Sequence, residues 1–366
     1  VFGALYQLIP VVFETSLYSE KLAKFTFWLF GFSILFLSYT FWVAAFSTLL
    51  IYASLLTFSA LLLFVVNVIL SYKNSKKKNI SSKFVVTAIL WLAVTELIGT
   101  LIAFNFKFNF FTEIHLHYLK IHATIGLLGW FLLLIIGVGS ILIPMFLVSH
   151  QLDENKLKKT YYLINFGLIG LVINWFFINF NFLDGIFWFM IAIGILFFFS
   201  FVYDAYKKRI RKILDIGMKH TMVSVLSIFL PLIISLIIIF GFDIEQPTLL
   251  RVTTLYGFTI VFGFITTLIL GQTYKTLPFV IWLEKYKGLV GKTKTPLPRE
   301  LYSEKIASMH LYVYLLFIIS MIFGLVFDNI WLIRIGSYAL LIVAILYNIN
   351  VFKIIFHTVK IEKNDN

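Results

Sequence analysis

The chain has 366 residues, of which 61% are hydrophobic and only 13% are charged, whereas an ordinary soluble domain carries about 25% charged residues. Its 42 phenylalanines and eight tryptophans cannot all be buried in one water-soluble core of this size, because a soluble fold still needs a wettable surface. The composition therefore excludes a soluble globular protein, a disordered chain and, despite the net charge of +13, a nucleic-acid-binding protein. The sequence has no cysteine, which excludes disulfides, thiolate metal sites and cysteine nucleophiles.

Apolar segments of spanning length follow one another along the chain. Residues Val1 to Pro10 are typical of the end of an apolar helix, and we expect further residues upstream. A membrane-spanning helix needs about 20 apolar residues. Ten such segments follow, near residues 25–45, 48–71, 84–104, 117–148, 160–180, 186–204, 217–241, 249–283, 303–325 and 329–357. We therefore predict an all-α integral membrane protein with ten full helices and one stub.

Basic residues are distributed unevenly between the loops. All but four of the 30 lysines and arginines lie toward the side of the membrane that holds the C-terminal tail and the loops after residues 12, 71, 148, 204 and 283. The opposite loops are short and rather acidic. Because basic loops stay on the cytoplasmic side, this predicts a multi-pass protein of a bacterial-type inner (cytoplasmic) membrane with a cytoplasmic C-terminus.

An internal repeat divides the chain. Three helix ends share a glycine followed seven positions later by a proline: Gly3 and Pro10, Gly137 and Pro144, Gly271 and Pro278. The interval from Pro10 to Pro144 equals the interval from Pro144 to Pro278, and residues 17–23 match residues 301–307 at six of seven positions. Such self-similarity predicts a twelve-helix bundle of three pseudo-symmetric four-helix units. The units end near these prolines within a single membrane domain, residues 1–366, and residues 303–366 form the last two helices and the cytoplasmic tail.

This organisation resembles subunit I of the haem–copper oxidase superfamily. The segment from His122 to Trp130, followed by Gly137 and Pro144, is similar to the His-x-His-x-Gly-x-Leu-Gly-Trp helix of the cbb-type branch, with Thr124 in place of the second histidine. The repeat covers nearly the whole chain, and the sharp motif is confined to this one helix. The resemblance implies haem inside the bundle, electron transport and respiration, with other respiratory-chain subunits or a cytochrome c-like donor as partners besides the lipid bilayer.

The sequence also departs from that family. Tyr256 and Phe258 stand at the positions equivalent to the paired histidines of the tenth helix, and no histidine lies between His150 and His220, where the family has its copper-binding pair. Copper is therefore doubtful and the dioxygen-reducing site incomplete. We expect a divergent, haem-binding, redox-linked protein, which is an oxidoreductase of the terminal oxidase or nitric oxide reductase type if upstream helices supply haem ligands. The alternative is a non-catalytic scaffold subunit of a respiratory complex, or a small-ligand or metal transporter on the same fold.

His122 is the first candidate ligand for haem or a metal. It lies about six residues, or about 9 Å, inside its helix, and an ionisable residue at such depth is a functional candidate. Imidazole binds haem iron and suits copper. The alternative is a neutral histidine that is hydrogen-bonded within the bundle.

Three more residues are cofactor-binding candidates. His115 and His117 precede His122 at the membrane surface and are either ligands or ordinary interfacial histidines. Tyr256 takes the position of His122 in the third unit, as a weak ligand, a hydrogen-bond donor or a packed aromatic residue.

Two charged residues inside spans are candidates for a proton path. Glu96 lies near the bilayer centre, where a carboxylate usually faces the bundle interior, and it either relays protons or forms a structural hydrogen bond. Lys275 precedes Pro278 and either extends to the cytoplasm or lines a path for protons or anions. The other four histidines lie near cytoplasmic helix ends, and we expect them to be solvated: His150, His220, His310 and His357.

Overall fold

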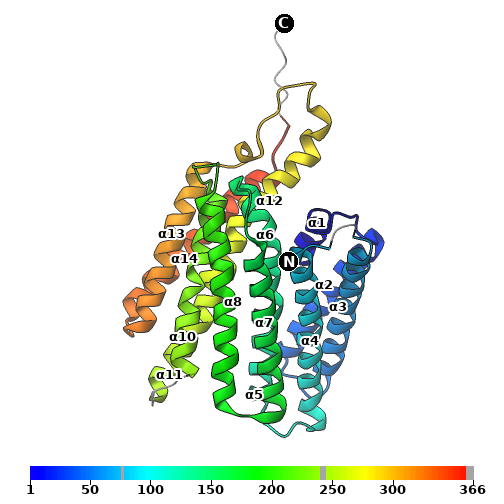
Figure 1. The fold of residues 1–366 in the computed structure, drawn as a ribbon, viewed down its shortest axis with the longest axis vertical. Helices are drawn as coiled ribbons and strands as arrows, with labels where there is room; N and C mark the ends of the chain where they lie inside the picture. The colour runs from blue at the N-terminus through cyan, green and yellow to red at the C-terminus, as the bar shows by residue number, and fades with distance from the viewer. Residues whose placement is uncertain (76–77, 240–244, 360–366) are drawn as a thin grey trace. The chain divides into compact units, whose positions relative to one another are not determined.

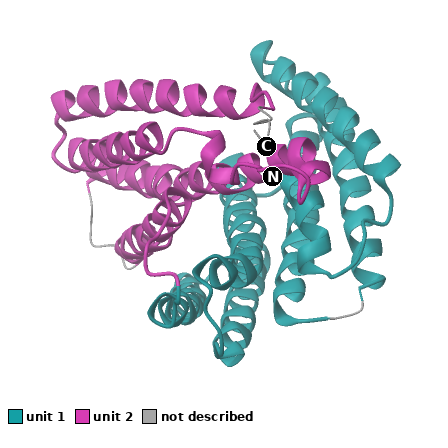
Figure 2. Cartoon of the chain, turned by 90° about the horizontal axis from the view of Figure 1, so that it is seen from above, with its two compact units in different colours: residues 1–210 teal, residues 211–366 magenta. Residues whose placement is uncertain are grey.

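The structure is a computed structural model that describes residues 1–75, 78–239 and 245–359 (Figure 1). Within these ranges all regular elements are helices and no strand occurs, which confirms the all-α prediction. The chain divides into two compact units, Val1–Ile210 and Arg211–Asn366 (Figure 2).

The described helices divide between the two units in chain order. The first unit contains α1 (Phe2–Val12), α2 (Glu20–Trp42), α3 (Leu49–Lys73), α4 (Ile80–Phe108), α5 (His115–Thr124), η1 (Ile125–Leu132), α6 (Leu133–Leu147), α7 (Glu154–Ile173), η2 (Asn174–Ile178) and α8 (Asn181–Lys207). The second contains α9 (Ile216–Ser227), α10 (Phe229–Ile239), α11 (Gln246–Phe258), η3 (Thr259–Thr266), α12 (Thr267–Tyr286), η4 (Lys287–Leu289), η5 (Pro298–Leu301), α13 (Glu304–Val326) and α14 (Ile330–Ile355).

In the described ranges, ten helical segments are long and apolar enough to cross a membrane, as predicted. One runs without interruption from His115 to Leu147, and another from Gln246 to Leu289, so a change of helix type does not break the span. The protein is therefore a multi-span helical membrane protein.

Helix α2 shows how the side chains are arranged for lipid. Its buried residues are Thr26, Ser33 and Thr40, which are evenly spaced at two helical turns and so share one face. Each donates its hydroxyl proton to a carbonyl one turn earlier in the helix. By contrast, Trp28 is 75% exposed and Trp42 is 88% exposed. Small polar side chains thus face the protein and large apolar ones face the membrane, as close packing in lipid favours.

Two of the long spans change from α-helix to π-helix at corresponding places. The π-helix η1 occupies Ile125–Leu132, and η3 occupies Thr259–Thr266. Both ends are offset by the same interval that separates Pro144 from Pro278. π-Helices are rare and usually brief. Their occurrence at corresponding positions therefore means that the two spans share the same departure from a regular α-helix.

The widened backbone of η3 is satisfied by hydroxyls of a neighbouring helix. Ser224 of α9 donates to the Phe264 carbonyl at 2.8 Å, and Ser227 donates to the Gly263 carbonyl at 2.5 Å. A carbonyl inside a span has no water to bond to, so these side chains fix α9 against η3.

A second correspondence is a close approach of backbone to backbone. A Cβ placed on Gly137 would lie 3.1 Å from the Ser81 carbonyl oxygen, and one placed on Gly271 would lie 2.9 Å from the Gly217 carbonyl oxygen. The repeated glycine therefore permits contact between α6 and α4 in the first unit and between α12 and α9 in the second.

We expect Gly271→Ala to lower the stability of the protein. The new methyl group would overlap the Gly217 carbonyl, and such overpacking typically costs about 1–3 kcal/mol. The matched control is Gly257→Ala, because a Cβ there meets no atom within 4 Å. The measurement is the apparent melting temperature in detergent. Equal melting temperatures for the two variants would contradict the close contact.

Candidate functional site

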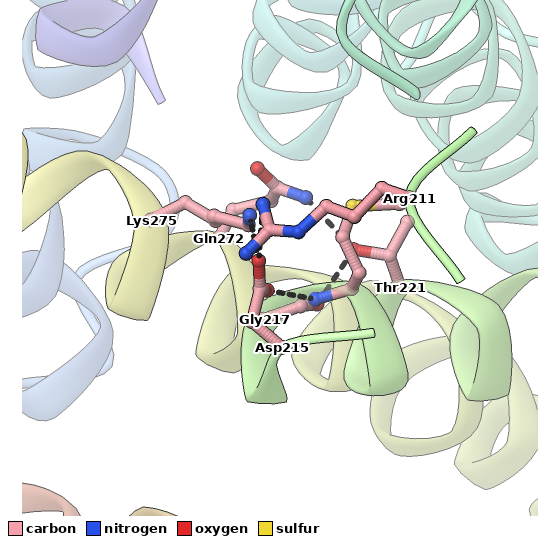
Figure 3. Close-up of polar contacts among 7 residues, drawn as sticks. Arg211, Asp215, Gly217, Thr221, Gln272 and Lys275 are labelled. Carbon is pink, nitrogen blue, oxygen red and sulfur yellow. Dashed lines mark hydrogen bonds and ion pairs between the residues drawn. The ribbon is translucent and has the colours of Figure 1, made fainter. Parts of the chain in front are cut away.

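The start of α9 carries a cluster of charged side chains (Figure 3). Asp215 caps the helix by accepting a hydrogen bond from the Met218 amide at 3.0 Å. The same carboxylate pairs with Lys275 of α12 and, at 3.3 Å, with Arg211 of the preceding loop. A carboxylate is favoured at this position by the exposed amides and the positive end of the helix dipole. The site therefore joins the start of α9 to α12.

The structure thus gives Lys275 a partner that the sequence alone did not indicate. Its side chain is 13% exposed and that of Asp215 is 20% exposed, so the pair is largely shielded from solvent. The expected extension of Lys275 into the cytoplasm is replaced by an ion pair inside the second unit. Its assignment to a proton path stays a prediction.

A second polar link lies about one turn earlier in α12 and nearly two turns further along α9. Gln272 donates through Nε2 to the Thr221 hydroxyl at 2.8 Å, and Thr221 donates to the Gly217 carbonyl at 2.9 Å (Figure 3). The other end of the amide, Oε1 of Gln272, is buried without a hydrogen-bond partner. This link continues the polar path from Asp215 toward the interior of the unit.

The most unusual feature of this unit is a pair of histidines, His220 of α9 and His310 of α13. Both are fully buried, and their ring centroids lie 5.3 Å apart. All four ring nitrogens lack a hydrogen-bond partner. Leaving a buried polar group unpaired costs about 1–3 kcal/mol, so this arrangement calls for a ligand, an ion or water.

The prediction that these two histidines are solvated is wrong. His220 is the fifth residue of α9, but it lies on the face that carries Ser224 and Ser227, which contacts η3. His310 lies on the face of α13 that carries Tyr314 and is fully buried. Closeness to a helix end in sequence therefore did not imply exposure.

The remaining two histidines near helix ends behave differently. His150 is exposed, as predicted. His357 is half-buried, and its Nε2 shares a 2.7 Å hydrogen bond with the Tyr286 hydroxyl, so it is only partly solvated.

Aromatic rings enclose the histidine pair. Ring centroids of Tyr274, Tyr314 and Tyr347 lie 5.7, 6.3 and 5.7 Å from that of His310. Tyr314 donates to the Phe262 carbonyl and Tyr347 donates to Thr273, so their hydroxyls are engaged. The histidines thus lie in a tyrosine-lined interior made by α9, α12, α13 and α14.

Tyr302 borders this interior outside the spans, between η5 and α13. Its ring centroid lies 5.3 Å from that of Tyr274. Burial is the main cause that raises the pKa of its hydroxyl to about 12, and the Asp215 charge adds to the effect. Tyr302 therefore stays neutral at physiological pH and adds no negative charge near Asp215.

In the first unit, the structure fixes the orientation of His122. Its Nδ1 lies 2.8 Å from the Thr95 carbonyl oxygen of α4. A carbonyl can only accept, so Nδ1 carries the proton and Nε2 keeps its lone pair. No described residue bonds to Nε2. The ring packs on Gly99, where a Cβ would lie 2.8 Å from the imidazole Cε1.

The other two histidines of that segment have separate partners. His115 accepts a 3.1 Å hydrogen bond from the Asn105 amide, and His117 donates to the Trp175 carbonyl at 3.0 Å. In the described ranges, no three His, Asp or Glu residues are grouped to hold a metal ion. The roles of His115 and His117 as cofactor ligands stay predictions.

Glu96 and Tyr256 are half-buried within their spans. Among the described residues, neither side chain has a hydrogen-bond or ion-pair partner. Glu96 directly follows Thr95, the residue that anchors His122. Proton transfer by Glu96 and ligation by Tyr256 both stay predictions.

No protein-family model matches this chain. No curated protein matches it either. The function therefore has to be inferred from His122 and from the His220–His310 pair.

We expect Asp215→Asn to destabilise the protein, because asparagine keeps the helix cap but removes the charge that pairs with Lys275. Breaking a fully buried pair costs about 3–5 kcal/mol, and the cost here is smaller because both side chains retain some exposure. The apparent melting temperature is the measurement, and the double variant Asp215→Asn/Lys275→Met should recover part of the loss.

The control for this prediction is Asp328→Asn, which removes the pair between Arg251 and Asp328. Asp328 is 76% exposed there, and such surface pairs contribute about 0–1 kcal/mol. A similar loss in Asp215→Asn and Asp328→Asn would show that the Asp215 pair stabilises the protein no more than a surface pair does.

Proposed function

We propose that this chain is a redox-linked, haem-binding membrane protein of the haem–copper oxidase subunit I type, with an incomplete dioxygen-reducing site. The observation that carries the proposal is the orientation of His122. Its Nδ1 is tied to the Thr95 carbonyl, and its Nε2 is left with a lone pair. Histidines that ligate metals usually donate their other ring N–H to a carbonyl or carboxylate in this way.

The donor chemistry of His122 fits an iron ligand. A neutral imidazole with a fixed ring and one uncommitted nitrogen is what haem iron takes from a protein. Haem supplies one-electron redox chemistry when bound. Nε2 of His122 would hold the iron, and Thr95 and Gly99 would fix the ring plane.

The proposed architecture is twelve helices in three four-helix units, and the repeat supports the correspondence of the spans that end near Pro144 and Pro278, whereas Gly3 makes no close contact. The interval between Pro144 and Pro278 recurs between the bounds of η1 and those of η3. It also recurs in the close contacts of Gly137 and Gly271 with a neighbouring helix. Dioxygen reduction is not part of the proposal, because Tyr256 and Phe258 replace the paired histidines of the family.

The proposal predicts a haem spectrum that depends on His122. A reduced-minus-oxidised spectrum of the purified protein should show Soret and alpha bands, which are lost or strongly weakened in His122→Ala because the iron loses its imidazole ligand. His150→Ala is the matched control, since His150 is exposed. A flat spectrum from correctly folded wild-type protein would overturn the haem proposal and favour a non-catalytic scaffold or a transporter.

We also propose that the protein lies in a bacterial-type inner membrane with its basic loops on the cytoplasmic side. Respiratory-chain subunits or a cytochrome c-like donor would be its partners. The support is the loop asymmetry: the loop around Lys212 is basic, whereas the loop around Thr112 is not.

The absence of cysteine makes this orientation directly testable. Lys212 and Thr112 are exposed. We expect Lys212→Cys to react with a membrane-impermeant maleimide only in inside-out vesicles, and Thr112→Cys to react only from the opposite side. The reverse pattern would contradict the orientation, and the unmodified chain is the control for background labelling.

A further inference from the structure

We propose that His220 and His310 bind one transition-metal ion between α9 and α13, with copper as the preferred ion. This site lies in the second unit, is separate from His122 and uses none of the residues that the proposed haem site needs. It rests on burial, on unpaired ring nitrogens and on the distance between the two rings.

The first step is the chemical state of the pair. Both rings are fully buried, and no described carboxylate is bonded to either of them. Two imidazoles this close without a counter-charge are neutral, since burying unpaired charge is far costlier than burying a neutral ring. Each neutral ring offers one lone pair, which is the form of histidine that binds metals.

The second step is the distance. A ring whose nitrogen ligates an ion at about 2.0–2.1 Å has its centroid about 3.2 Å from that ion. Two such rings at a tetrahedral angle have centroids about 5.2 Å apart, and the observed separation of His220 and His310 is 5.3 Å. A water bridging the same nitrogens at about 2.9 Å would hold the centroids about 6.5 Å apart. The separation of the two centroids therefore agrees with one ion bound by both rings.

The third step is the choice of further ligands. Tyr274 lies beside both rings, with centroids 6.4 Å from His220 and 5.7 Å from His310. Its hydroxyl is buried near the Asn350 side chain but makes no hydrogen bond of normal geometry. The Tyr274 hydroxyl or a water molecule would therefore complete the coordination of an ion held by the two imidazoles.

The identity of the ion follows from the donor set. Imidazole suits copper, zinc, iron and nickel, and among divalent first-row ions copper binds nitrogen sites most strongly. The nearby charges do not attract a cation, because Asp215 is offset by both Lys275 and Arg211. Ligation by the neutral rings must supply the affinity, which favours copper over the harder ions.

The test is metal binding by the purified full chain in detergent. Copper sulfate or zinc sulfate is added alone, unbound metal is removed, and copper, zinc and iron are counted separately per chain. We expect about one copper ion per wild-type chain, and at least about tenfold weaker binding in His220→Ala and in His310→Ala, since each loses one ligand. His150→Ala should bind as the wild type does.

A second pair of variants and a spectroscopic measurement complete the test. If an alanine variant does not fold, His220→Gln and His310→Gln replace it, because glutamine retains a polar side chain. The electron paramagnetic resonance spectrum of the copper-loaded protein should show coupling to two imidazole nitrogens, reduced to one in each single variant.

The proposal is overturned if the folded wild type binds no copper, or if both variants bind it as tightly as the wild type. His122→Ala separates this site from the haem proposal, because it should lose haem bands and keep copper. Loss of copper together with haem in that variant would also overturn a separate site at His220 and His310.

Discussion

The fold depends on the requirement that polar groups inside the membrane find partners within the protein, because lipid offers none. Helix α2 meets it by turning Thr26, Ser33 and Thr40 inward and bonding each hydroxyl to its own backbone. Helix α9 meets it by using Ser224 and Ser227 to satisfy the carbonyls of η3. The same requirement explains why the faces exposed to lipid are rich in aromatic and aliphatic side chains. It also explains why hydrogen bonds from hydroxyls, and not only packing of apolar side chains, hold α9 to η3.

The ionisable residues meet this requirement to different extents. Lys275 is matched by Asp215, and His122 is matched on one nitrogen by the Thr95 carbonyl. His220 and His310 are fully buried, and neither ring has a hydrogen-bond partner for either of its nitrogens. Some single polar atoms of the described residues are also buried without a partner, among them the Thr100 hydroxyl and Gln272 Oε1, but in this pair four ring nitrogens lie together. The proposed metal ion would satisfy one nitrogen of each ring.

Features that depend on composition and periodicity could be predicted from the sequence. Features that depend on which face of a helix carries a side chain were not predicted. The number of spans follows from apolar length, and the contact made by Gly271 follows the glycine–proline repeat. The burial of His220 was missed because depth was judged by distance from the helix end. The signal was present, since the helical period places His220 with Ser224 and Ser227 on one polar face. The partner of Lys275 lies 60 residues away in the chain, and no local pattern indicates it.

The repeat also explains why the fold alone does not determine the function. What recurs at the interval between the prolines is a backbone constraint, namely the π-helical segments and a glycine pressed against a carbonyl. That constraint fixes how helices approach but leaves neighbouring side chains free to differ, so His122 of one span corresponds to Tyr256 of the other. Chemistry is therefore carried by individual side chains placed on a shared scaffold. A resemblance in the scaffold supports an architecture, whereas a redox or metal-binding role has to be established at His122 and at the His220–His310 pair separately.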